Sequence, residues 1–483
     1  MPYGIPTLVF LIFLSPLVAQ HIPAGLEKDK QTVAMALEAG KQPFIDLASK
    51  IWGLAELGYK EEQSSKLLQD ILRQAGFSIQ VGQAGIPTAF TASFGSGDPV
   101  IGILGEFDAL PGFSQAAVPR KQEIPGKTTG HACGHHLFGS ASAAAAIAVK
   151  DWMVSRKIPG TIRFYGTPAE EGGAGKVYMV RAGLFNDVAA IIHWHPGDEN
   201  SANPSSSLAN KSAKFRFRGI ASHAAASPEM GRSALDAVEA MNFMVNLMRE
   251  HVPEKARMHY VITRGGEAPN VVPAFSEVYY YIRHPEMEVV KDLFQRVVRA
   301  AEGAAAGTGT TMDYEVIHGV YNLLPNEVLA GAVFRNLKAV GGVDYSPSEM
   351  EFAGQLLPTL NRKDIRIADA ALVQPFSTES NDPGGSTDVG DISWLVPTAG
   401  LSSATWVPGT SAHSWQAVAA GGMSIGHKGM LVAAKTMAHT LMDCLTDATL
   451  REGAKKELLR RRGEPFLYEA LLGNRNPPLD YRN

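Results

Sequence analysis

The sequence predicts an α/β protein with a second, inserted α+β domain. At 483 residues the chain is too long for one small hydrophobic core, so two domains are expected. Over roughly the first 210 residues, short apolar runs alternate with stretches of helical spacing, which is typical of a sheet covered by helices. Residues 211–324 instead follow a β-α-β-β-α-β order, which indicates a ferredoxin-like fold.

The first region supplies the strands of the predicted central sheet. Residues 27–75 are predicted to form two amphipathic helices. The run 100–105 is apolar throughout and is followed by Glu106 and Asp108, which indicates a buried central strand with polar groups at its carboxyl end. Further strands are predicted at 77–81, 89–94, 161–166 and 188–194, and an alanine-rich helix at 141–149. Sites in α/β sheets form at the carboxyl ends of strands, so the polar residues there are the candidates.

The insert divides the larger domain into residues 27–210 and 325–450. Residues 214–218 alternate polar and apolar side chains, as a half-exposed strand does. The other elements predicted in the insert are helices at 233–252 and 289–304 and strands at 259–263, 276–283 and 311–317. Residues 451–483 are charged and contain prolines, and they are predicted to form a C-terminal tail.

The N-terminus is apolar from Leu8 to Ala19. Such a run is too short to span a bilayer but fits the core of a signal peptide, here residues 1–20. We therefore expect a secreted or periplasmic protein that leaves the membrane when the signal is removed. A membrane anchor and a cytoplasmic location are the alternatives, because the segment before Leu8 lacks Lys and Arg.

Charge and cysteine content narrow the function class. Lys and Arg number 44 against 48 Asp and Glu, a net charge of -4, so nothing indicates binding to nucleic acid or to an anionic membrane. The two cysteines, Cys133 and Cys444, do not make a disulfide framework. Cys444 lies in an apolar helical pattern and is interpreted as a core residue.

One tract stands out as a candidate metal site. Residues 128–139 read Thr-Thr-Gly-His-Ala-Cys-Gly-His-His-Leu-Phe-Gly, which places a thiolate ligand, Cys133, and an imidazole ligand, His135, one residue apart. His136 could orient a ligand without binding the metal, which is the role we assign to it, or simply pack in the core. A Cys, His and carboxylate site suits Zn²⁺, and a site richer in carboxylates also admits Mn²⁺.

The acidic pair Glu170-Glu171 follows the next predicted strand. Two adjacent carboxylates repel each other, so one can bind a metal while the other, with a raised pKa, removes a proton from water. Asp108 is expected to orient a ligand. The side chains of His193 and His195 are on one face of their strand, and either could be a ligand.

Two histidines lie far along the chain from this tract. His223 is in the inserted domain, and a movement of that domain or a second subunit would have to bring it to a reacting carbonyl, where it would stabilise an oxyanion. His413 lies in a loop rich in small residues and is a candidate for a missing imidazole ligand.

These motifs resemble the metallopeptidase family that contains aminoacylases, hippurate hydrolases, carboxypeptidase G and the plant auxin-conjugate hydrolases, in its cysteine-ligand branch. The resemblance spans roughly 27–445. It rests on the Cys-Gly-His tract and on Gly-Glu-Phe-Asp-Ala-Leu-Pro-Gly at 105–112, Trp-His-Pro-Gly at 194–197 and the segments 385–394, 413–416 and 424–430, which occur in the order of the family. It is greatest to the members of that family that act on p-aminobenzoyl-glutamate.

The resemblance implies a zinc-peptidase-like domain, with a mixed central sheet flanked by helices, and a lid and dimerisation domain at 211–324. It implies two divalent metal ions that share Cys133, with His135, Glu171, His193 or His195, and His413 completing the ligands. It further implies Glu170 as general base, a homodimer that brings His223 to a neighbouring active site, and Asn270 as a substrate contact. His136 departs from the pattern, because relatives carry Asp or Asn there.

The expected activity is hydrolysis of an amide bond in N-acyl or N-aroyl amino acids, including compounds like p-aminobenzoyl-glutamate. A dipeptidase or carboxypeptidase is the alternative enzyme. A non-catalytic metal- or ligand-binding protein is the alternative outside enzymes. A cysteine hydrolase that uses Cys133 with His135 is a further alternative, which predicts activity without metal.

Overall fold

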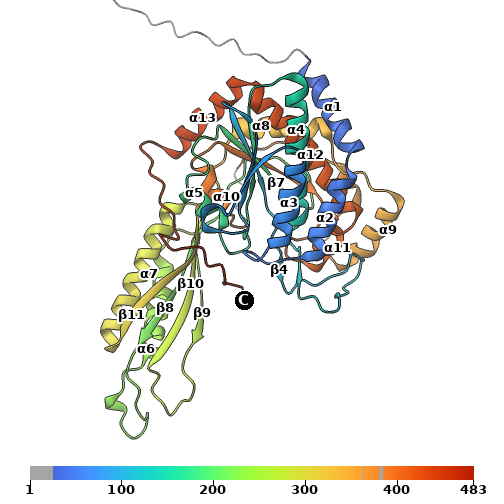
Figure 1. The fold of residues 1–483 in the computed structure, drawn as a ribbon. Coiled ribbons are helices and arrows are strands. Elements are labelled where there is room, and N and C mark those ends of the chain that lie inside the picture. Colours follow the sequence, from blue (N-terminus) through green and yellow to red (C-terminus); the bar gives the residue numbers. More distant parts are fainter. Residues whose placement is uncertain (1–24, 363, 380–383, 483) are drawn as a thin grey trace, which may run out of the picture.

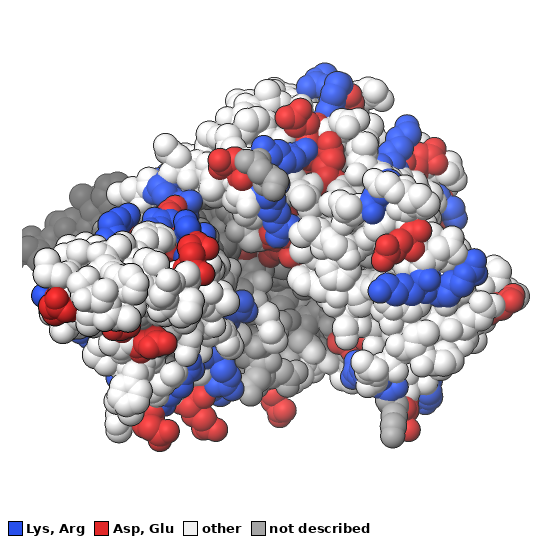
Figure 2. Space-filling view, turned by 90° about the horizontal axis from the view of Figure 1, so that it is seen from below, with Lys and Arg blue, Asp and Glu red and all other residues white. Residues whose placement is uncertain are grey.

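The computed structural model describes residues 25–362, 364–379 and 384–482, and the expected signal peptide lies outside them. These residues form a larger α/β domain and a lid domain that projects from it (Figure 1). On the face shown in Figure 2, a recess separates two lobes, and basic and acidic side chains are interspersed on both.

The larger domain is built on a six-stranded mixed sheet in the order β1-β2-β6-β3-β7-β12. Strands β6, β3, β7 and β12 are parallel to one another, whereas β2 is antiparallel to both of its neighbours, β1 and β6. The strands are β1 (Ser78–Val81), β2 (Phe90–Ser96), β3 (Val100–Gly105), β6 (Gly160–Gly166), β7 (Ala190–Gly197) and β12 (Thr398–Ala404), with a separate pair β4 (Leu110–Pro111) and β5 (Thr129–Gly130). Since β3, β6 and β7 run in the same direction, the residues that follow them meet at one edge of the sheet.

Helices cover this sheet on both faces. They are α1 (Leu26–Ala39), α2 (Gln42–Leu54), α3 (Glu62–Gln74), α4 (His135–Arg156), α5 (Gly175–Arg181), α8 (Glu327–Val340), α9 (Pro347–Leu356), α10 (Val389–Ser393), α11 (Trp415–Gly421), α12 (Ser424–Thr446) and α13 (Ala448–Arg462). Short 3-10 turns are η1 (Gln83–Gly85), η2 (Pro228–Met230), η3 (Arg249–His251), η4 (Leu357–Thr359) and η5 (Ile367–Ala371). Among the described residues, α4 alone is long and apolar enough to cross a membrane, but 72% of that stretch is buried inside the protein. Its alanines let it pack closely against β3 and α12, so it is a core helix.

The lid domain has the predicted β-α-β-β-α-β order. Its elements are β8 (Ala209–Arg218), α6 (Ala234–Met248), β9 (Arg257–Arg264), β10 (Phe275–His284), α7 (Met287–Thr308) and β11 (Thr311–Val320). The four strands form an antiparallel sheet in the order β11-β8-β10-β9. Both helices pack on one face of it, and the buried side chains between them form a core separate from that of the larger domain. The prediction of an α/β fold with a ferredoxin-like insert is confirmed.

The helices of the larger domain that were not predicted from the sequence include α1 and α13. Residues 27–75 contain three helices rather than two, because α1 buries only four side chains, two of them the charged Asp29 and Lys30, and so lacks a clear apolar stripe. Residues 451–462 belong to α13, which packs on α8, so the expected tail begins only after Arg462. Most side chains of α13 are charged and few are apolar, so its sequence shows no clear helical periodicity of apolar residues.

Candidate metal centre

Three loops at the carboxyl ends of neighbouring strands bring the candidate site together. Glu106 and Asp108 follow β3, the pair Glu170-Glu171 follows β6, and His195 lies near the end of β7. Cys133 and His135 come from the turn between β5 and α4. That turn needs Gly134, which has a φ of 78° and whose position leaves no room for a Cβ beside Pro196. The helix begins at His135, six residues earlier than predicted, so this imidazole is fixed in the first helical turn.

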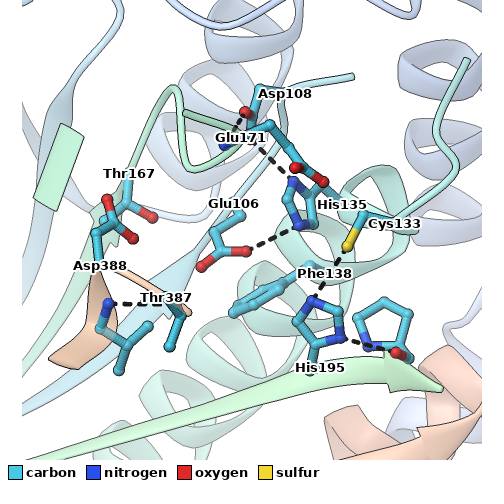
Figure 3. Close-up of polar contacts among 12 residues, drawn as sticks. Glu106, Asp108, Cys133, His135, Phe138, Thr167, Glu171, His195, Thr387 and Asp388 are labelled. Atoms are coloured by element: carbon cyan, nitrogen blue, oxygen red, sulfur yellow. Dashed lines mark hydrogen bonds and ion pairs between the residues drawn. The ribbon is translucent and has the colours of Figure 1, made fainter. Parts of the chain in front are cut away.

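Cys133 faces the imidazole of His195, which has an unprotonated nitrogen on the side of the sulfur. Its Sγ lies 3.5 Å from Nε2 of His195 (Figure 3). His195 Nδ1 donates a hydrogen bond to the carbonyl oxygen of Pro196 at 2.8 Å, so the lone pair is on Nε2, toward the sulfur. Burial, followed by the charge of His135, lowers the pKa of His195 to about 4, which keeps the ring neutral. His193 lines the same cleft, but it belongs to none of the clusters that hold three potential ligand atoms together in the described part of the chain.

His135 lies between two carboxylates (Figure 3). Its Nδ1 donates to Asp108 Oδ1 at 2.9 Å, and its Nε2 faces Glu106 Oε2 at 3.1 Å. With Nδ1 protonated, Nε2 and Oε2 are two buried acceptors without a donor. A buried pair of this kind requires a cation or a proton between its atoms. Asp108 also accepts from the backbone N–H of Glu171 through Oδ2 at 2.9 Å, so it fixes two candidate ligands at once.

The described side chains form three candidate ligand sets, two of which share one sulfur atom; the third consists of Glu106, His135 and Glu170. Cys133, His135 and His195 place their ligand atoms within 4.8 Å of one another, and so do Cys133, Glu171 and His413. His413 Nε2 lies 3.1 Å from Glu171 Oε1, and its backbone N–H donates to the carbonyl oxygen of Ala132. A thiolate, imidazoles and a carboxylate are a suitable donor set for Zn²⁺ or Mn²⁺, so the residues fit a pair of divalent cations.

The electrostatics of the cluster favour bound cations. Burial, followed by the charge of Glu171, raises the pKa of the Cys133 thiol. Burial alone would lower the pKa of His135, but the neighbouring Cys133, Glu106 and Asp108 raise it well above its usual value. The site therefore attracts positive charge. A nucleophilic cysteine instead has a lowered thiol pKa, so the raised pKa of the Cys133 thiol does not favour a cysteine hydrolase.

Glu170 lies beside the candidate ligands, and the pKa of its carboxyl is raised. Burial raises its pKa well above the usual value, and the charges of Glu106, Glu171 and Asp388 raise it further. Glu171 differs: burial would raise its pKa, but the hydrogen bond from His413 and the charge of His135 hold it lower. The two neighbouring carboxyls thus have opposite pKa shifts, as the sequence led us to expect of an acid–base group beside a ligand.

A charged network behind the site was not predicted from the sequence. The ammonium of Lys176, fully buried on α5, contacts Glu106 Oε1 at 2.7 Å and Asp388 Oδ1 at 2.6 Å. Glu106 and Asp388 lie within the motifs that carry the family resemblance, but neither motif indicated a role for them. Lys176 directly precedes the apolar run Val-Tyr-Met-Val. A lysine next to such a run was the one feature of the sequence that could have indicated a buried ammonium group.

Three predicted site residues lie away from the cluster. His136 Nε2 donates to the carbonyl oxygen of Gly421 at 2.9 Å, and its ring packs on His131, so the expectation that it orients a ligand is corrected to packing between α4 and α11. His223 and Asn270 are exposed and adjacent on the lid, where the Asn270 carbonyl oxygen accepts the N–H of Ala224. His223 follows β8 and Asn270 precedes β10. Both lie at the far end of the lid, about 30 Å from the larger domain along the length of β8.

The cluster opens into a cleft of about 830 Å³ between the two domains. The lid contributes Asn210, Tyr281, Arg283 and His318 to its lining, and the larger domain contributes the candidate ligands and residues 384–388. A cleft of this volume accommodates a small molecule with one aromatic ring.

Comparisons with known proteins agree with this arrangement. Residues 102–417 match the model of peptidase family M20/M25/M40. The chain is 43% identical to one of the subunits of p-aminobenzoyl-glutamate hydrolase from Escherichia coli, over 87% of this chain and 93% of that protein. It is 31% identical to the Xaa-Arg dipeptidase of Mus musculus over 90% of this chain and 93% of that protein.

Solved structures share the fold at low sequence identity. A putative aminohydrolase from methicillin-resistant Staphylococcus aureus aligns with a TM-score of 0.65 at 17% identity, covering 86% of this chain and all of that one. A dinuclear metal-binding peptidase of the M20 family from Bacillus subtilis aligns with a TM-score of 0.57 at 19% identity, covering 84% of this chain and 99% of that one. The matched family and the extent of the relatives show that the chain belongs to peptidase family M20/M25/M40 and is a metallohydrolase.

Proposed function

We propose that this hydrolase cleaves the amide bond of N-acyl or N-aroyl amino acids, and that p-aminobenzoyl-glutamate represents its substrate class. The observation that carries the proposal is the pair of ligand sets sharing Cys133 beside Glu170, whose pKa is raised, in a cleft between two domains. The 43% identity to a protein of p-aminobenzoyl-glutamate hydrolase supports the substrate class.

Two divalent cations, Zn²⁺ or Mn²⁺, would be held by the shared sulfur of Cys133. His135 and His195 complete one set, and Glu171 and His413 complete the other. His195 is assigned as the ligand in place of His193, because its Nε2 lone pair is directed at the sulfur. Such cations polarise a carbonyl and lower the pKa of water.

Glu170 moves the proton in this proposal. As a carboxylate it accepts a proton from the attacking water, and its raised pKa lets it keep that proton while the tetrahedral intermediate forms. It then donates the proton to the leaving amine nitrogen, which would otherwise depart as a poor leaving group. Asp108 holds His135 and the backbone of Glu171 in place throughout.

His223 is proposed to stabilise the oxyanion in the site of a second copy of this chain. Its Nδ1 accepts the N–H groups of Ala225 and Ala226, each at 3.2 Å, so the proton is on Nε2, which is free to donate. Its distance along the lid from the cleft of its own chain favours a site in the neighbouring subunit. Asn270, beside it, is proposed to contact the same substrate.

The lid offers a surface for a homodimer. Strand β9 is at the edge of the lid sheet and exposes Tyr260, Val261 and Ile262. On α6, Phe243 is 66% exposed and Leu247 is 57% exposed. An exposed apolar edge strand favours pairing with another strand, and a second copy of β9 would cover it.

A dipeptidase is the second candidate, because the chain is 31% identical to a mammalian Xaa-Arg dipeptidase. The test is a panel of p-aminobenzoyl-glutamate, other N-aroyl and N-acyl amino acids, and Xaa-Arg dipeptides, each with and without chelator. The proposal predicts the highest kcat/KM on an N-aroyl amino acid and complete loss with chelator. A higher kcat/KM on dipeptides would favour the second candidate, and full turnover by Glu170→Gln would refute the proton-transfer role.

We also propose that the protein is exported, on the basis of the apolar run from Leu8 to Ala19. Expression of the full chain in a bacterial host, followed by fractionation and N-terminal sequencing, tests this. A new N-terminus near Gln20 in the periplasmic or secreted fraction is expected. An uncleaved chain in the cytoplasm would contradict it.

A further inference from the structure

The segment 463–482 packs along the protein and crosses from one domain to the other. In Figure 1 it is the dark red trace that leaves α13, passes the base of the lid and ends at the point marked C, between the two domains. Phe466 stacks on Trp394, and Tyr468 donates through its hydroxyl to the buried carboxylate of Asp391 at 2.7 Å. The segment is therefore fixed in place from its start.

Its middle part is bound to both domains at once. Arg475 Nη1 donates to the carbonyl oxygen of Ile317 at 2.8 Å in lid strand β11. The carbonyl oxygen of Arg475 accepts from Arg181 Nη1 at 2.7 Å, and Arg181 ends α5 of the larger domain. Leu471 packs so closely on Gly319 that a Cβ there would lie 2.8 Å from its backbone. The segment thus joins β11 to the helix that follows the Glu170-Glu171 loop.

Its last part reaches the acidic loop itself. The hydroxyl of Tyr481 donates to the backbone carbonyl oxygen of Glu171 at 3.1 Å, and Arg482 Nη2 donates to the same oxygen. The Tyr481 ring packs edge-on against Tyr59 at 5.5 Å, and Tyr59 in turn donates to the carbonyl oxygen of Gly173 at 2.7 Å. These three side chains donate to backbone carbonyl oxygens on both sides of Gly172, while Glu61 accepts the N–H of Ala169 at 2.7 Å and Asp108 accepts that of Glu171.

The loop needs such support because its backbone is in an unfavourable conformation. Ala169 and Ala174, on either side of the acidic pair, have φ values of 57° and 56°, in the left-handed region that residues with a Cβ avoid. Between β6 and α5 no helix or strand holds the chain. Strained backbone persists only where surrounding contacts impose it, and here the side-chain contacts come from residues 59, 61, 108, 481 and 482.

We propose that Tyr481 and Arg482 are positioning residues, which hold the Glu170-Glu171 loop in the conformation that directs both carboxyls at the candidate metal centre. The inference rests on the proposed role of Glu170. It assigns to the segment 463–482 a part in the activity of this chain, with Arg475 and Arg181 fixing the path of the segment across the two domains.

The test compares the full chain with Tyr481→Phe, Arg482→Ala and the double variant, each purified with its metal. Tyr481→Phe removes only the hydroxyl and keeps the ring against Tyr59. Tyr314→Phe, on the exposed surface of the lid, is the matched control for loss of a tyrosine hydroxyl. Two quantities are measured: kcat and KM on an N-aroyl amino acid, and amide hydrogen exchange of residues 167–182 by mass spectrometry.

The double variant is expected to lose about 10-fold in kcat with KM within about twofold, because a small displacement of a catalytic carboxyl slows chemistry more than binding. Exchange of residues 167–182 should accelerate about 10-fold, while α13 and the lid exchange as before. Arg482→Lys keeps one donor and should recover part of the loss.

Unchanged kcat and unchanged exchange in the loop would overturn the inference. Acceleration over the whole chain would also overturn it, since that result marks a contribution to global stability. Exchange does not depend on turnover, so it separates this inference from the proposed function. If Glu170→Gln retained full activity while the loop still opened in the double variant, the proposed function would be wrong and the positioning contacts would remain.

Discussion

Cys133 Sγ lies 3.5 Å from Nε2 of His195, and the same sulfur is within 4.8 Å of the ligand atoms of Glu171 and His413. One side chain therefore connects residues from the β5–α4 turn, β7, the loop after β6 and the loop before α11. The sulfur at this junction belongs to both candidate ligand sets, and burial, which raises the pKa of the thiol, does not favour a free nucleophile.

Cys133→Ser should abolish tight metal binding. A serine hydroxyl is not deprotonated under conditions in which a thiolate binds Zn²⁺, and both ligand sets lose their shared member. We expect the metal content after dialysis to fall to less than about one tenth of that of the native protein, with a fall in kcat/KM of at least about 100-fold. Elemental analysis measures this. Cys444→Ser, at the other cysteine, is the control and should keep its metal; native metal content in Cys133→Ser would contradict the assignment.

Asp108→Asn should weaken metal binding without removing a ligand. The carboxylate accepts from His135 Nδ1 and from the Glu171 backbone, and an amide can accept at only one of these positions. The misoriented imidazole should reduce the affinity for metal by about 10- to 100-fold. Competition with a chromogenic chelator measures the affinity. An affinity within about twofold of the native value would show that Asp108 does not orient His135.

Lys176→Met should destabilise the fold. It removes the ammonium from between Glu106 and Asp388 and leaves two buried carboxylates unpaired, at a cost of about 3–5 kcal/mol in the free energy of unfolding. Urea denaturation of the metal-free proteins measures it. Lys66→Met, which removes an exposed partner of Asp70, should cost less than about 1 kcal/mol. Equal effects of the two substitutions would refute a structural role for the buried network.

Asp391 should make stability depend on pH. Burial, aided by the charge of Asp388, raises the pKa of Asp391 to about 7, whereas the unfolded chain ionises near the usual value of 3.8. Between pH 3.8 and about pH 7 the carboxyl of Asp391 is therefore protonated in the folded state but ionised in the unfolded state. The resulting contribution to the free energy of unfolding is fully present below pH 3.8 and is lost as the pH rises toward 7.

Asp391→Asn removes this titration but keeps a side chain of the same shape. The difference in unfolding free energy between the native protein and the variant should decline by up to about 4 kcal/mol from about pH 4 to about pH 8. Urea denaturation across this range provides the measurement. A difference that is constant, or that grows with pH, would show that Asp391 is ionised in the folded protein.

A mixture of two inactive variants tests the role of His223. If His223 acts in the neighbouring subunit, dimers of one Glu170→Gln chain and one His223→Ala chain contain one complete site. Random exchange of equal amounts should then restore about 25% of native activity, since half of the dimers are mixed and each has one of two sites. Action within one chain predicts no recovery, and gel filtration shows whether mixed dimers can form at all.

Local sequence signals predicted the sheet and which candidate ligands follow its strands. Val100–Gly105 is apolar throughout because β3 is buried in the middle of the sheet, and the direction of β3, β6 and β7 brings Asp108, Glu171 and His195 together. The choice between His193 and His195 could not be made from the sequence. It depends on the hydrogen bond from His195 Nδ1 to Pro196 and on the position of Cys133.

Contacts between distant residues could not be predicted from the sequence. Lys176 meets Asp388 across 212 residues, and Tyr481 meets Glu171 across 310. Neither pair has a spacing that periodicity can indicate. The segment after Arg462 shows no periodicity, because it is held by separate side-chain contacts to two domains instead of by a helical or strand pattern.

The most direct test of the account is a metal titration of the purified, chelator-treated chain. We predict that activity on an N-aroyl amino acid is absent without metal and returns in proportion to added Zn²⁺ or Mn²⁺, up to about two ions per chain. We further predict that the Cys133 thiol resists alkylation once the metal is bound. Full activity in protein freed of metal, abolished by alkylation of that thiol, would contradict the account and establish Cys133 as a nucleophile.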